Sequence, residues 1–307
     1  MGDRVMWFNG SCVPWEDARV HVWDELALRG ANVFEGVTAF WDEERGHHRI
    51  LAGEQHLDRL YGSARLADIP APASREEVLA ALAEVAGALP GTDVYLRPTF
   101  YAAAGRSTLS PGSAGGMYIG GFEFNPVAPP VVRAVVSSHR RFGGPIGALA
   151  KTGGSYLDFR LFERERIAHG VEHVLILNDQ GQLAEADGAA ILLVGAGTVV
   201  APSVDSGVLD SITKRIVLDL ARHLGYAVME RRVLREELHG ARVLLAGTLL
   251  GLRQVDSIDG VDSTGGGDDA AAAVVRALTE EYGGLCRGGH PLADRWLAPL
   301  GKPGRDA

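Results

Sequence analysis

Residues 148–156 are the stretch that says most about the fold and chemistry of this chain, and they read Ala-Leu-Ala-Lys-Thr-Gly-Gly-Ser-Tyr. Lysine is rare in the sequence, which holds only Lys151, Lys214 and Lys302 among 30 basic residues. A lysine amine can form a Schiff base once burial or a neighbouring cation lowers its pKa, whereas an arginine guanidinium stays protonated. Lys151 is therefore the first candidate for a reactive residue, although scarcity alone also fits a compositional preference for arginine.

The composition is that of an ordinary globular protein, with 46% hydrophobic and 22% charged residues over 307 positions. The net charge of −9, without a basic stripe carrying aromatic residues, argues against a nucleic-acid partner. No apolar run reaches the ~18–20 residues that span a bilayer, and the N-terminus lacks a signal-peptide run, so we expect no membrane partner. Cys12 and Cys286 show no metal-ligand spacing, so we expect no metal, reduced thiols and a cytoplasmic location.

The first part of the chain mixes strand and helix periodicities. Strands are expected at residues 5–8, 19–23, 33–41, 93–101 and 116–122. Helices are expected at 54–68 and 74–88, and the second begins with a capping box because Glu77 follows Ser74 by three residues. Three prolines between Phe124 and Pro130 mark a linker. The expected division is therefore a small domain over residues 1–124, a linker at 125–130 and a large domain over 131–307.

The second part continues the mixture and gives an α+β fold class. Strands are expected at 131–138, 172–178, 183–185, 190–201 (as a pair) and 242–246. Helices are expected at 156–169, 211–224, 234–240 and 270–282, the last ending at Gly283-Gly284. The Gly- and Asp-rich residues 262–269 are expected to form a loop.

Four features of the second part point to one kind of chemistry. Tyr156 follows Lys151 by five residues, and Glu185 lies at the end of an expected hairpin strand. Residues 211–213 (Ser-Ile-Thr) open a helix, and Gly247-Thr248 follow a buried apolar strand, so backbone N–H groups there can bind an anion. A Schiff-base lysine, an acid for a ring nitrogen, a phenol and a phosphate cradle are what pyridoxal phosphate needs.

In these features the sequence resembles the branched-chain aminotransferase family, the fold-type IV enzymes that depend on pyridoxal phosphate. The resemblance runs from about Ala18 to Trp296 and rests on several short motifs in family order. These are residues 32–36 (Asn-Val-Phe-Glu-Gly), 56–60 (His-Leu-Asp-Arg-Leu), 95–98 (Tyr-Leu-Arg-Pro), 151–156, 181–185, 209–214 and 247–248. It implies a small N-terminal α/β domain, a larger β-barrel-like domain, and a homodimer with a shared active site.

The resemblance also implies roles for individual residues. Lys151 would hold the cofactor covalently and move the proton between substrate Cα and cofactor C4′. Glu185 would pair with the ring nitrogen, and Tyr156 would hydrogen-bond the ring O3′. Arg59 would bind the phosphate, together with a set of cofactor-binding residues on the second domain: Ser211, Ile212, Thr213, Gly247 and Thr248. Lys214 stands where relatives carry arginine and is expected to be a charge on the helix surface.

The substrate side is expected to involve Phe34, Tyr95 and Arg97, with Arg29, Leu249 and Leu250 as departures from the family pattern. The leucine pair replaces small residues, and its side chains could point away from the substrate or fill the pocket. Arg29 replaces an aromatic residue, and with Arg97 it could favour a second carboxylate on the substrate. The alternative for Arg29 is an ion pair at a dimer interface.

Other departures are Ser155 and Ala190 at positions that usually hold asparagine, Gln254 in place of proline, and Asp210-Ser211 in place of Pro-Gly. They leave three functions open. The leading one is a ping-pong transaminase that moves an amino group from an L-amino acid, branched-chain or specialised, to a 2-oxo acid. The others are a lyase of the aminodeoxychorismate lyase type, which shares the lysine, and a degenerate homologue that acts as a binding protein.

Overall fold

The computed structural model describes residues 4–105, 114–124, 131–141, 146–263 and 269–301. The chain forms two compact units: the first holds Met1–Asn125, Ala150–Tyr156 and Cys286–Ala307, and the second holds Pro126–Leu149 and Leu157–Leu285. The expected linker at 125–130 lies outside the described residues. Two segments that the sequence assigned to the large domain, 150–156 and 286–307, belong to the first unit instead. Backbone hydrogen bonds explain the first of these, because Phe34 N donates to Lys151 O at 3.1 Å and Gly153 N donates to Asn32 O at 3.0 Å.

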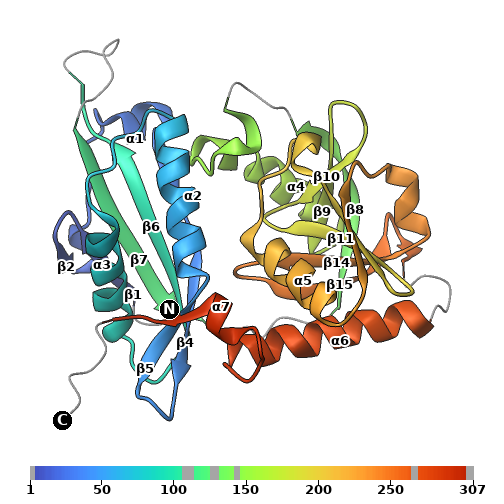
Figure 1. Cartoon of the computed structure of the whole chain (residues 1–307). Helices are drawn as coiled ribbons and strands as arrows, with labels where there is room; N and C mark the ends of the chain where they lie inside the picture. Colours follow the sequence, from blue (N-terminus) through green and yellow to red (C-terminus); the bar gives the residue numbers. More distant parts are fainter. Residues whose placement is uncertain (1–3, 106–113, 125–130, 142–145, 264–268, 302–307) are drawn as a thin grey trace. The chain divides into compact units, whose positions relative to one another are not determined.

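The first unit is built on an antiparallel sheet in the strand order β17-β5-β4-β6-β7-β1-β2, with β3 beside β6 (Figure 1). The strands are β1 (Arg4–Phe8), β2 (Ser11–Val13), β3 (Asn32–Phe34), β4 (Val37–Asp42), β5 (His47–Leu51), β6 (Val94–Ala102), β7 (Gly115–Glu123) and β17 (Leu297–Pro299). Its helices are α1 (Glu25–Arg29), α2 (Gly53–Leu66), α3 (Arg75–Gly87) and α7 (Ala293–Trp296). The predicted capping box of α3 is confirmed, because Ser74 and Glu77 exchange both capping hydrogen bonds.

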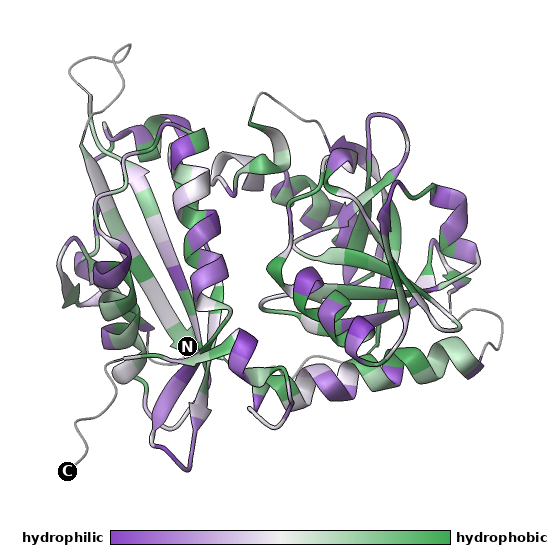
Figure 2. Cartoon of the chain, viewed as in Figure 1, coloured by the Kyte–Doolittle hydropathy of each residue, from purple (hydrophilic) through white to green (hydrophobic). Residues whose placement is uncertain are grey.

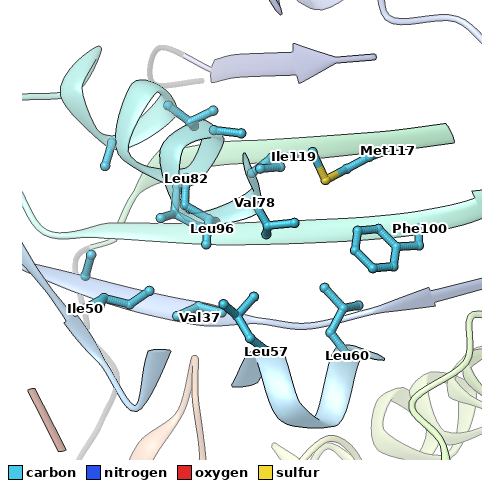
Figure 3. Close-up of a cluster of buried hydrophobic side chains, with 14 of the residues drawn as sticks. Val37, Ile50, Leu57, Leu60, Val78, Leu82, Leu96, Phe100, Met117 and Ile119 are labelled. Atoms are coloured by element: carbon cyan, nitrogen blue, oxygen red, sulfur yellow. The ribbon is translucent and has the colours of Figure 1, made fainter. Parts of the chain in front are cut away.

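Helices α2 and α3 share one apolar core with the strands of the first unit (Figure 3). The buried side chains on the two helices recur every three or four residues: Leu57, Leu60, Val78 and Leu82. Strand residues such as Leu96 and Phe100 alternate with residues on the other face of β6, since successive side chains of a strand point to opposite sides. This alternation leaves Tyr95 and Arg97 on the face of β6 that does not enter the core.

The second unit holds a mixed sheet in the order β10-β9-β8-β15-β14-β11-β12-β13, with β16 beside β15. Its strands are β8 (Val131–Arg141), β9 (His173–Asn178), β10 (Leu183–Ala186), β11 (Ala190–Gly195), β12 (Thr198–Pro202), β13 (Ala227–Arg231), β14 (Arg242–Gly247), β15 (Gly251–Ile258) and β16 (Val261–Asp262). The strands are mostly hydrophobic (Figure 2). The two ends of the sheet meet, because Leu183 N donates to Val233 O at 2.8 Å. The predicted barrel-like character of this part is therefore present.

Two helices of the second unit pack on this sheet: α4 (Phe159–His169) on β8 and β9, and α5 (Ile212–His223) on β11 to β14. Residues 269–285 of α6 (Asp269–Cys286) also belong to this unit. No helix in the described ranges is long and apolar enough to cross a membrane.

Several local predictions are wrong, each for a physical reason. Residues 19–23 form no strand: Asp24 N closes a turn on His21 O at 2.9 Å, and the alternating Val20 and Val22 are exposed. The expected strand at 33–41 breaks between β3 and β4 at Glu35-Gly36. Helix α6 runs through the expected stop at Gly283-Gly284, because Leu285 and Cys286 are buried at its end and packing outweighs glycine's low helix propensity. Residues 235–239 form a single 3₁₀ segment rather than an α-helix.

Candidate active site

The backbone of Lys151 is fixed within the first unit by α2 and β3. Its N–H donates to Ser63 Oγ at 3.0 Å, and its carbonyl accepts from Phe34 N at 3.1 Å. Thr152 continues this pairing as an isolated bridge to Val33. Ser63 belongs to α2 and Phe34 to β3. Because both partners lie in regular secondary structure, the position of the Lys151 Cα is fixed before any ligand binds.

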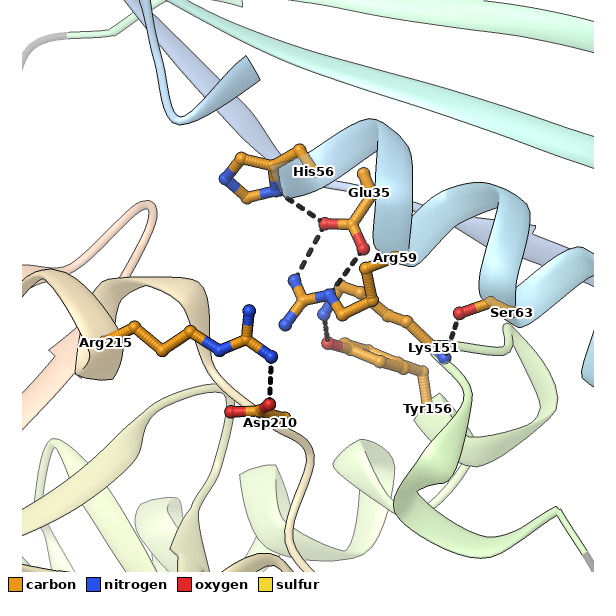
Figure 4. A network of polar contacts seen from close by, with 8 residues as sticks. All are labelled: Glu35, His56, Arg59, Ser63, Lys151, Tyr156, Asp210 and Arg215. Atoms are coloured by element: carbon orange, nitrogen blue, oxygen red, sulfur yellow. Dashed lines mark hydrogen bonds and ion pairs between the residues drawn. The ribbon is translucent and has the colours of Figure 1, made fainter. Parts of the chain in front are cut away.

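The Lys151 amine lies in an aromatic cage. Its Nζ donates to Tyr156 Oη at 2.5 Å and stands 4.9 Å from the ring centroids of both Phe34 and Tyr156 (Figure 4). The two rings meet edge to face with centroids 4.8 Å apart. The 3₁₀ segment Gly154–Tyr156 brings the phenol back toward the amine. The structure thus pairs Lys151 directly with Tyr156, a contact that the sequence analysis did not predict.

Gly153 allows the lysine loop to approach β3 closely. A Cβ at this position would lie 2.4 Å from the side-chain amide of Asn32. That amide cannot easily move, because its Nδ2 donates to Gly30 O at 3.2 Å. The glycine of the lysine motif is therefore needed for the packing of the loop as well as for its shape.

Arg59, the predicted phosphate residue, is held by a buried network that the sequence prediction did not include (Figure 4). Its Nε and Nη2 donate to Glu35 Oε1 and Oε2 at 2.7 and 2.8 Å. The Glu35 side chain is 0% exposed, and His56 Nδ1 lies 2.7 Å from its Oε2. Burial alone raises the pKa of Glu35, but the charge and hydrogen bonds of Arg59 and the hydrogen bond of His56 outweigh it and lower the pKa to about 2.

The same network fixes the tautomer of His56. Burial lowers the pKa of His56, more than the contact with Glu35 raises it, so the imidazole is neutral near pH 7. An ionised Glu35 only accepts hydrogen bonds, so His56 carries its proton on Nδ1. The guanidinium of Arg59 is therefore oriented by a carboxylate that is itself held in place. The signal for this network was present in the sequence as a histidine and an arginine three residues apart on one helix face.

Three predicted substrate residues lie in the same unit as Lys151. The Arg97 guanidinium stacks 3.8 Å from the ring centroid of Phe34, which also faces the lysine amine. Burial raises the pKa of Tyr95 to about 12, although the charge of Arg97 opposes this, so its phenol is neutral. A Cβ at Gly36 would lie 2.3 Å from Tyr95 Oη, which explains glycine there. Phe34 therefore links the lysine amine to Arg97.

Arg29 takes part in an intrahelical contact. It lies in α1, its side chain is 43% exposed, and its Nη1 stands 3.5 Å from Glu25 Oε1 one turn earlier. The Arg29 guanidinium lies at the surface, whereas the Glu25 side chain is only 12% exposed, so the contact ties Arg29 to a largely buried carboxylate.

Glu185, the predicted partner of the ring nitrogen, lies on β10 in the second unit. A β-bulge between Leu183 and Glu185 shifts the register against β9. Glu185 Oε1 stands 3.1 Å from Arg141 Nε, and its Oε2 accepts from Leu209 N at 3.4 Å. The carboxylate is thus positioned by Arg141 at the end of β8, two strands away in the sheet, and by the segment that leads into α5.

The residues predicted to form an anion cradle, Ser211, Ile212 and Thr213, lie at the N-terminus of α5. Ser211 is the N-cap, and its Oγ accepts from Lys214 N at 3.2 Å. Helix geometry gives the N–H groups of Ile212 and Thr213 no acceptor within α5, so they are available to an anion.

The second half of the predicted cradle is the turn after β14. A Cβ at Gly247 would lie 3.0 Å from Gly188 O, so the backbone is close-packed before Thr248. Leu250 packs against the barrel core, whereas Leu249 is 48% exposed. The Leu250 side chain therefore points into the core of its own unit, which is the first of the two orientations expected for the leucine pair.

The prediction for Lys214 is wrong. Its side chain is only 2% exposed, and its Nζ stands 2.5 Å from Glu230 Oε2 and 3.4 Å from Asp210 Oδ1. The apolar face of α5 is wide enough to include position 214, so the ammonium is drawn inside and satisfied by two carboxylates.

Each unit, taken by itself, carries groups that fit pyridoxal phosphate. The first unit has the Lys151 amine bonded to the Tyr156 phenol and an oriented Arg59. The second has the positioned Glu185 carboxylate and the N-terminus of α5. When bound, the cofactor would supply an electron sink for the bonds at substrate Cα.

Comparisons with known proteins agree with this assignment of the cofactor. The chain matches the family described as amino-transferase class IV over residues 32–258. It is 30% identical to the branched-chain-amino-acid aminotransferase of Escherichia coli strain K12 over 304 residues, which covers 95% of each protein. It is also 30% identical over 302 residues to a probable branched-chain-amino-acid aminotransferase of Aquifex aeolicus, covering 95% of this chain and 96% of the relative.

Solved structures give the same result. The branched-chain aminotransferase of Thermoproteus uzoniensis with norvaline has a TM-score of 0.86 at 27% identity and covers 97% of this chain and 99% of that chain. The enzyme of Thermobaculum terrenum in its PLP form has a TM-score of 0.87 at 28% identity, with 98% and 99% covered.

The chain therefore belongs to the class IV aminotransferase family. It is a fold-type IV aminotransferase that uses pyridoxal phosphate. The lyase and binding-protein alternatives are not favoured, since these relatives are named as aminotransferases.

Proposed function

We propose that this enzyme moves the amino group of an aliphatic L-amino acid to a 2-oxo acid in two half-reactions, with Lys151 as the base that handles the substrate Cα proton. The observation that carries the proposal is the contact of Lys151 Nζ with Tyr156 Oη inside the cage of Phe34 and Tyr156. A positioned amine of this kind can accept and return a proton at one carbon, which is what both half-reactions require.

The other roles follow the chemistry of each group. Tyr156 orients the amine and donates to the cofactor ring oxygen, and Glu185 pairs with the ring nitrogen. Arg59, oriented by Glu35, binds the cofactor phosphate. The remaining phosphate contacts come from the second unit: Ser211, Ile212, Thr213, Gly247 and Thr248.

The substrate class is supported by the contacts of Phe34. Its ring offers an apolar surface for an aliphatic side chain beside the amine, and Arg97 stacked on it offers a cation for an acidic donor such as glutamate. The relatives are named for branched-chain amino acids, and one of them is described with norvaline. A panel of valine, leucine, norvaline and glutamate against 2-oxoglutarate and pyruvate tests this; turnover confined to aromatic donors would contradict it.

A specialised preference among amino donors would depend on Arg29. If it favours a second carboxylate, Arg29→Ala lowers kcat/KM for glutamate relative to leucine, and Arg19→Ala, which removes another charge from the same exposed segment, leaves the ratio unchanged. If the ratio of kcat/KM for glutamate and leucine is unchanged in Arg29→Ala, the remaining role for Arg29 is an ion pair at the dimer interface.

The role of Lys151 is tested with two replacements. Lys151→Ala removes the amine, and Lys151→Arg keeps a positive charge that cannot form a Schiff base. Both variants are expected to lose the visible absorbance of lysine-bound cofactor and to lose transamination, while circular dichroism stays that of the wild type. Transamination by Lys151→Arg at a wild-type rate would overturn the proposal.

We propose a homodimer as the working form. The segment between β2 and α1, together with α1 itself, exposes several large apolar side chains: Trp15, Val20, Val22, Trp23 and Leu28. Grouped exposed apolar residues are typical of a protein interface. Val22→Asp is expected to give monomers in sedimentation velocity, whereas Val261→Asp, at another exposed valine, is not. A Val22→Asp protein that sediments as the wild type does would argue against this surface. We also propose a cytoplasmic location, which suits the reduced thiols of Cys12 and Cys286.

A further inference from the structure

Lys214 is a buried cation whose place in the reaction is not explained by the roles above. Its side chain is 2% exposed, and a primary ammonium is costly to bury unless it is paired and hydrogen-bonded. Two carboxylates pair with it, Glu230 at 2.5 Å and Asp210 at 3.4 Å. An apolar residue would fill this space on α5 without any such requirement, so the charge itself needs a reason.

The reason is Asp210, because its carboxylate lies where a negative charge disfavours the binding of a phosphate. It directly precedes the N-cap Ser211, and hence the N–H groups of Ile212 and Thr213 that are proposed to bind phosphate. Burial raises the pKa of Asp210, but its hydrogen bond to Arg215 and the charge of Lys214 outweigh this and lower the pKa, so Asp210 is ionised near pH 7. A carboxylate beside a phosphate site repels the phosphate unless cations offset it.

The cations that offset Asp210 come from the first turn of α5. Arg215 pairs with Asp210 Oδ2 (Figure 4), and Lys214 with Oδ1. The two differ in environment: Arg215 is 49% exposed and screened by solvent, whereas Lys214 is enclosed and acts at low dielectric. Arg215 makes the closer contact with Asp210, and Lys214 adds a second positive charge that is enclosed by the protein.

Lys214 also connects the segment that leads into α5, one half of the proposed cradle, to strand β13. Through Glu230 it is linked to β13, and through Asp210 to the residues leading into α5. The neighbouring Leu209 N donates to Glu185 Oε2 at 3.4 Å, so the segment it holds also contacts the proposed acid of the ring nitrogen.

We propose that Lys214 is a positioning residue for the cofactor phosphate. Its buried ammonium neutralises Asp210 and Glu230 and so keeps the N–H groups of Ile212 and Thr213 favourable to a dianion. The inference rests on pyridoxal phosphate as cofactor and not on the choice of amino acid substrate.

The test compares two ligands that share a ring and differ in the phosphate. Full-length protein freed of cofactor is titrated with pyridoxal phosphate and with pyridoxal, and the dissociation constants are read from absorbance. Lys214→Met is expected to weaken pyridoxal phosphate by about tenfold or more and pyridoxal by less than about threefold. Arg222→Met is the matched control, because Arg222 is an exposed ion-paired cation on the same helix; it is expected to change neither constant.

Two further variants separate charge from structure. Lys214→Met combined with Asp210→Asn is expected to bind pyridoxal phosphate more tightly than Lys214→Met alone, because the uncompensated carboxylate is gone. Lys214→Arg keeps the charge and is expected to keep the preference for the phosphorylated ligand.

The results that overturn the proposal are distinct. Equal weakening of both ligands by Lys214→Met means a purely structural role, and no rescue by Asp210→Asn removes the electrostatic argument. If Lys214→Met does not fold, Asp210→Asn alone decides: tighter binding of pyridoxal phosphate with unchanged pyridoxal supports the proposal, and unchanged binding of both refutes it. None of these constants depends on transamination, so failure of the proposed substrate class would leave them as they are.

Discussion

Glu35→Gln removes one charge from a network that is wholly buried, and its effect on stability can be worked from the structure. Glu35 accepts three hydrogen bonds, two from Arg59 and one from His56. A glutamine offers one acceptor oxygen and an NH₂ group. The NH₂ group would therefore face an N–H donor of Arg59 or His56 instead of accepting a hydrogen bond from it. The variant therefore loses both the charge and part of the hydrogen bonding.

The pKa of Glu35 gives the magnitude. It falls from the ordinary value of 4.5 to about 2 on folding, a difference of about 2.5 units. At 1.36 kcal/mol per unit this corresponds to about 3 kcal/mol of folding free energy, in the range found when one partner of a buried ion pair is removed. Because the folded pKa is lowered, this contribution is complete above pH 4.5 and is lost as the pH falls toward about 2.

The assay is urea unfolding followed by tryptophan fluorescence at several pH values. Glu35→Gln is expected to be destabilised by about 3 kcal/mol at pH 7, with the gap to the wild type shrinking below pH 4.5. The control is Glu54→Gln on α2, whose side chain is 67% exposed and pairs only with the partly exposed Arg75 in the first unit; it is expected to cost less than about 0.5 kcal/mol. A loss below about 1 kcal/mol in Glu35→Gln, or a loss that stays constant down to pH 3, would refute the reasoning.

Three further predictions concern the same unit. Tyr156→Phe removes the hydrogen bond to Lys151 and is expected to lower kcat by about 10- to 100-fold with little change in melting temperature; an unchanged kcat would show that the phenol is dispensable. Gly36→Ala forces Tyr95 to move, since the added Cβ would lie 2.3 Å from its Oη, and is expected to raise KM for the amino donor and to lower stability by about 1–3 kcal/mol; wild-type kinetics would show that the ring moves freely. Partial burial and the hydrogen bond and charge of Glu84 raise the pKa of the Cys12 thiol to about 11, although the residue as a whole is exposed. Its alkylation by iodoacetamide is therefore expected to keep accelerating from pH 8 to about pH 10.5, and a rate that levels off near pH 9 would contradict this.

The parts of the fold that the sequence predicted are those governed by local rules. The capping box of α3 was readable because both of its partners lie within one turn. The apolar strand β14 and the helix α5 were readable because their hydrophobic residues repeat with the period of one kind of element. The residues at 19–23 misled for the complementary reason, since alternation describes one strand but does not say whether a second strand is there to pair with it.

The sequence by itself pointed to Lys151, Tyr156 and the class of cofactor, because these predictions depend on residue types at fixed spacing along the chain. Only the tertiary structure decided how Arg59 is held and that Lys214 is buried, because Glu35 lies 24 residues before Arg59, and Glu230 lies 16 residues after Lys214. The sequence does not show whether a charged side chain is buried. Burial arises only when segments that are distant along the chain pack around the charge and exclude water from it. The same exclusion of water makes Glu35 and Lys214 matter, since ion pairs count for most where solvent cannot screen them.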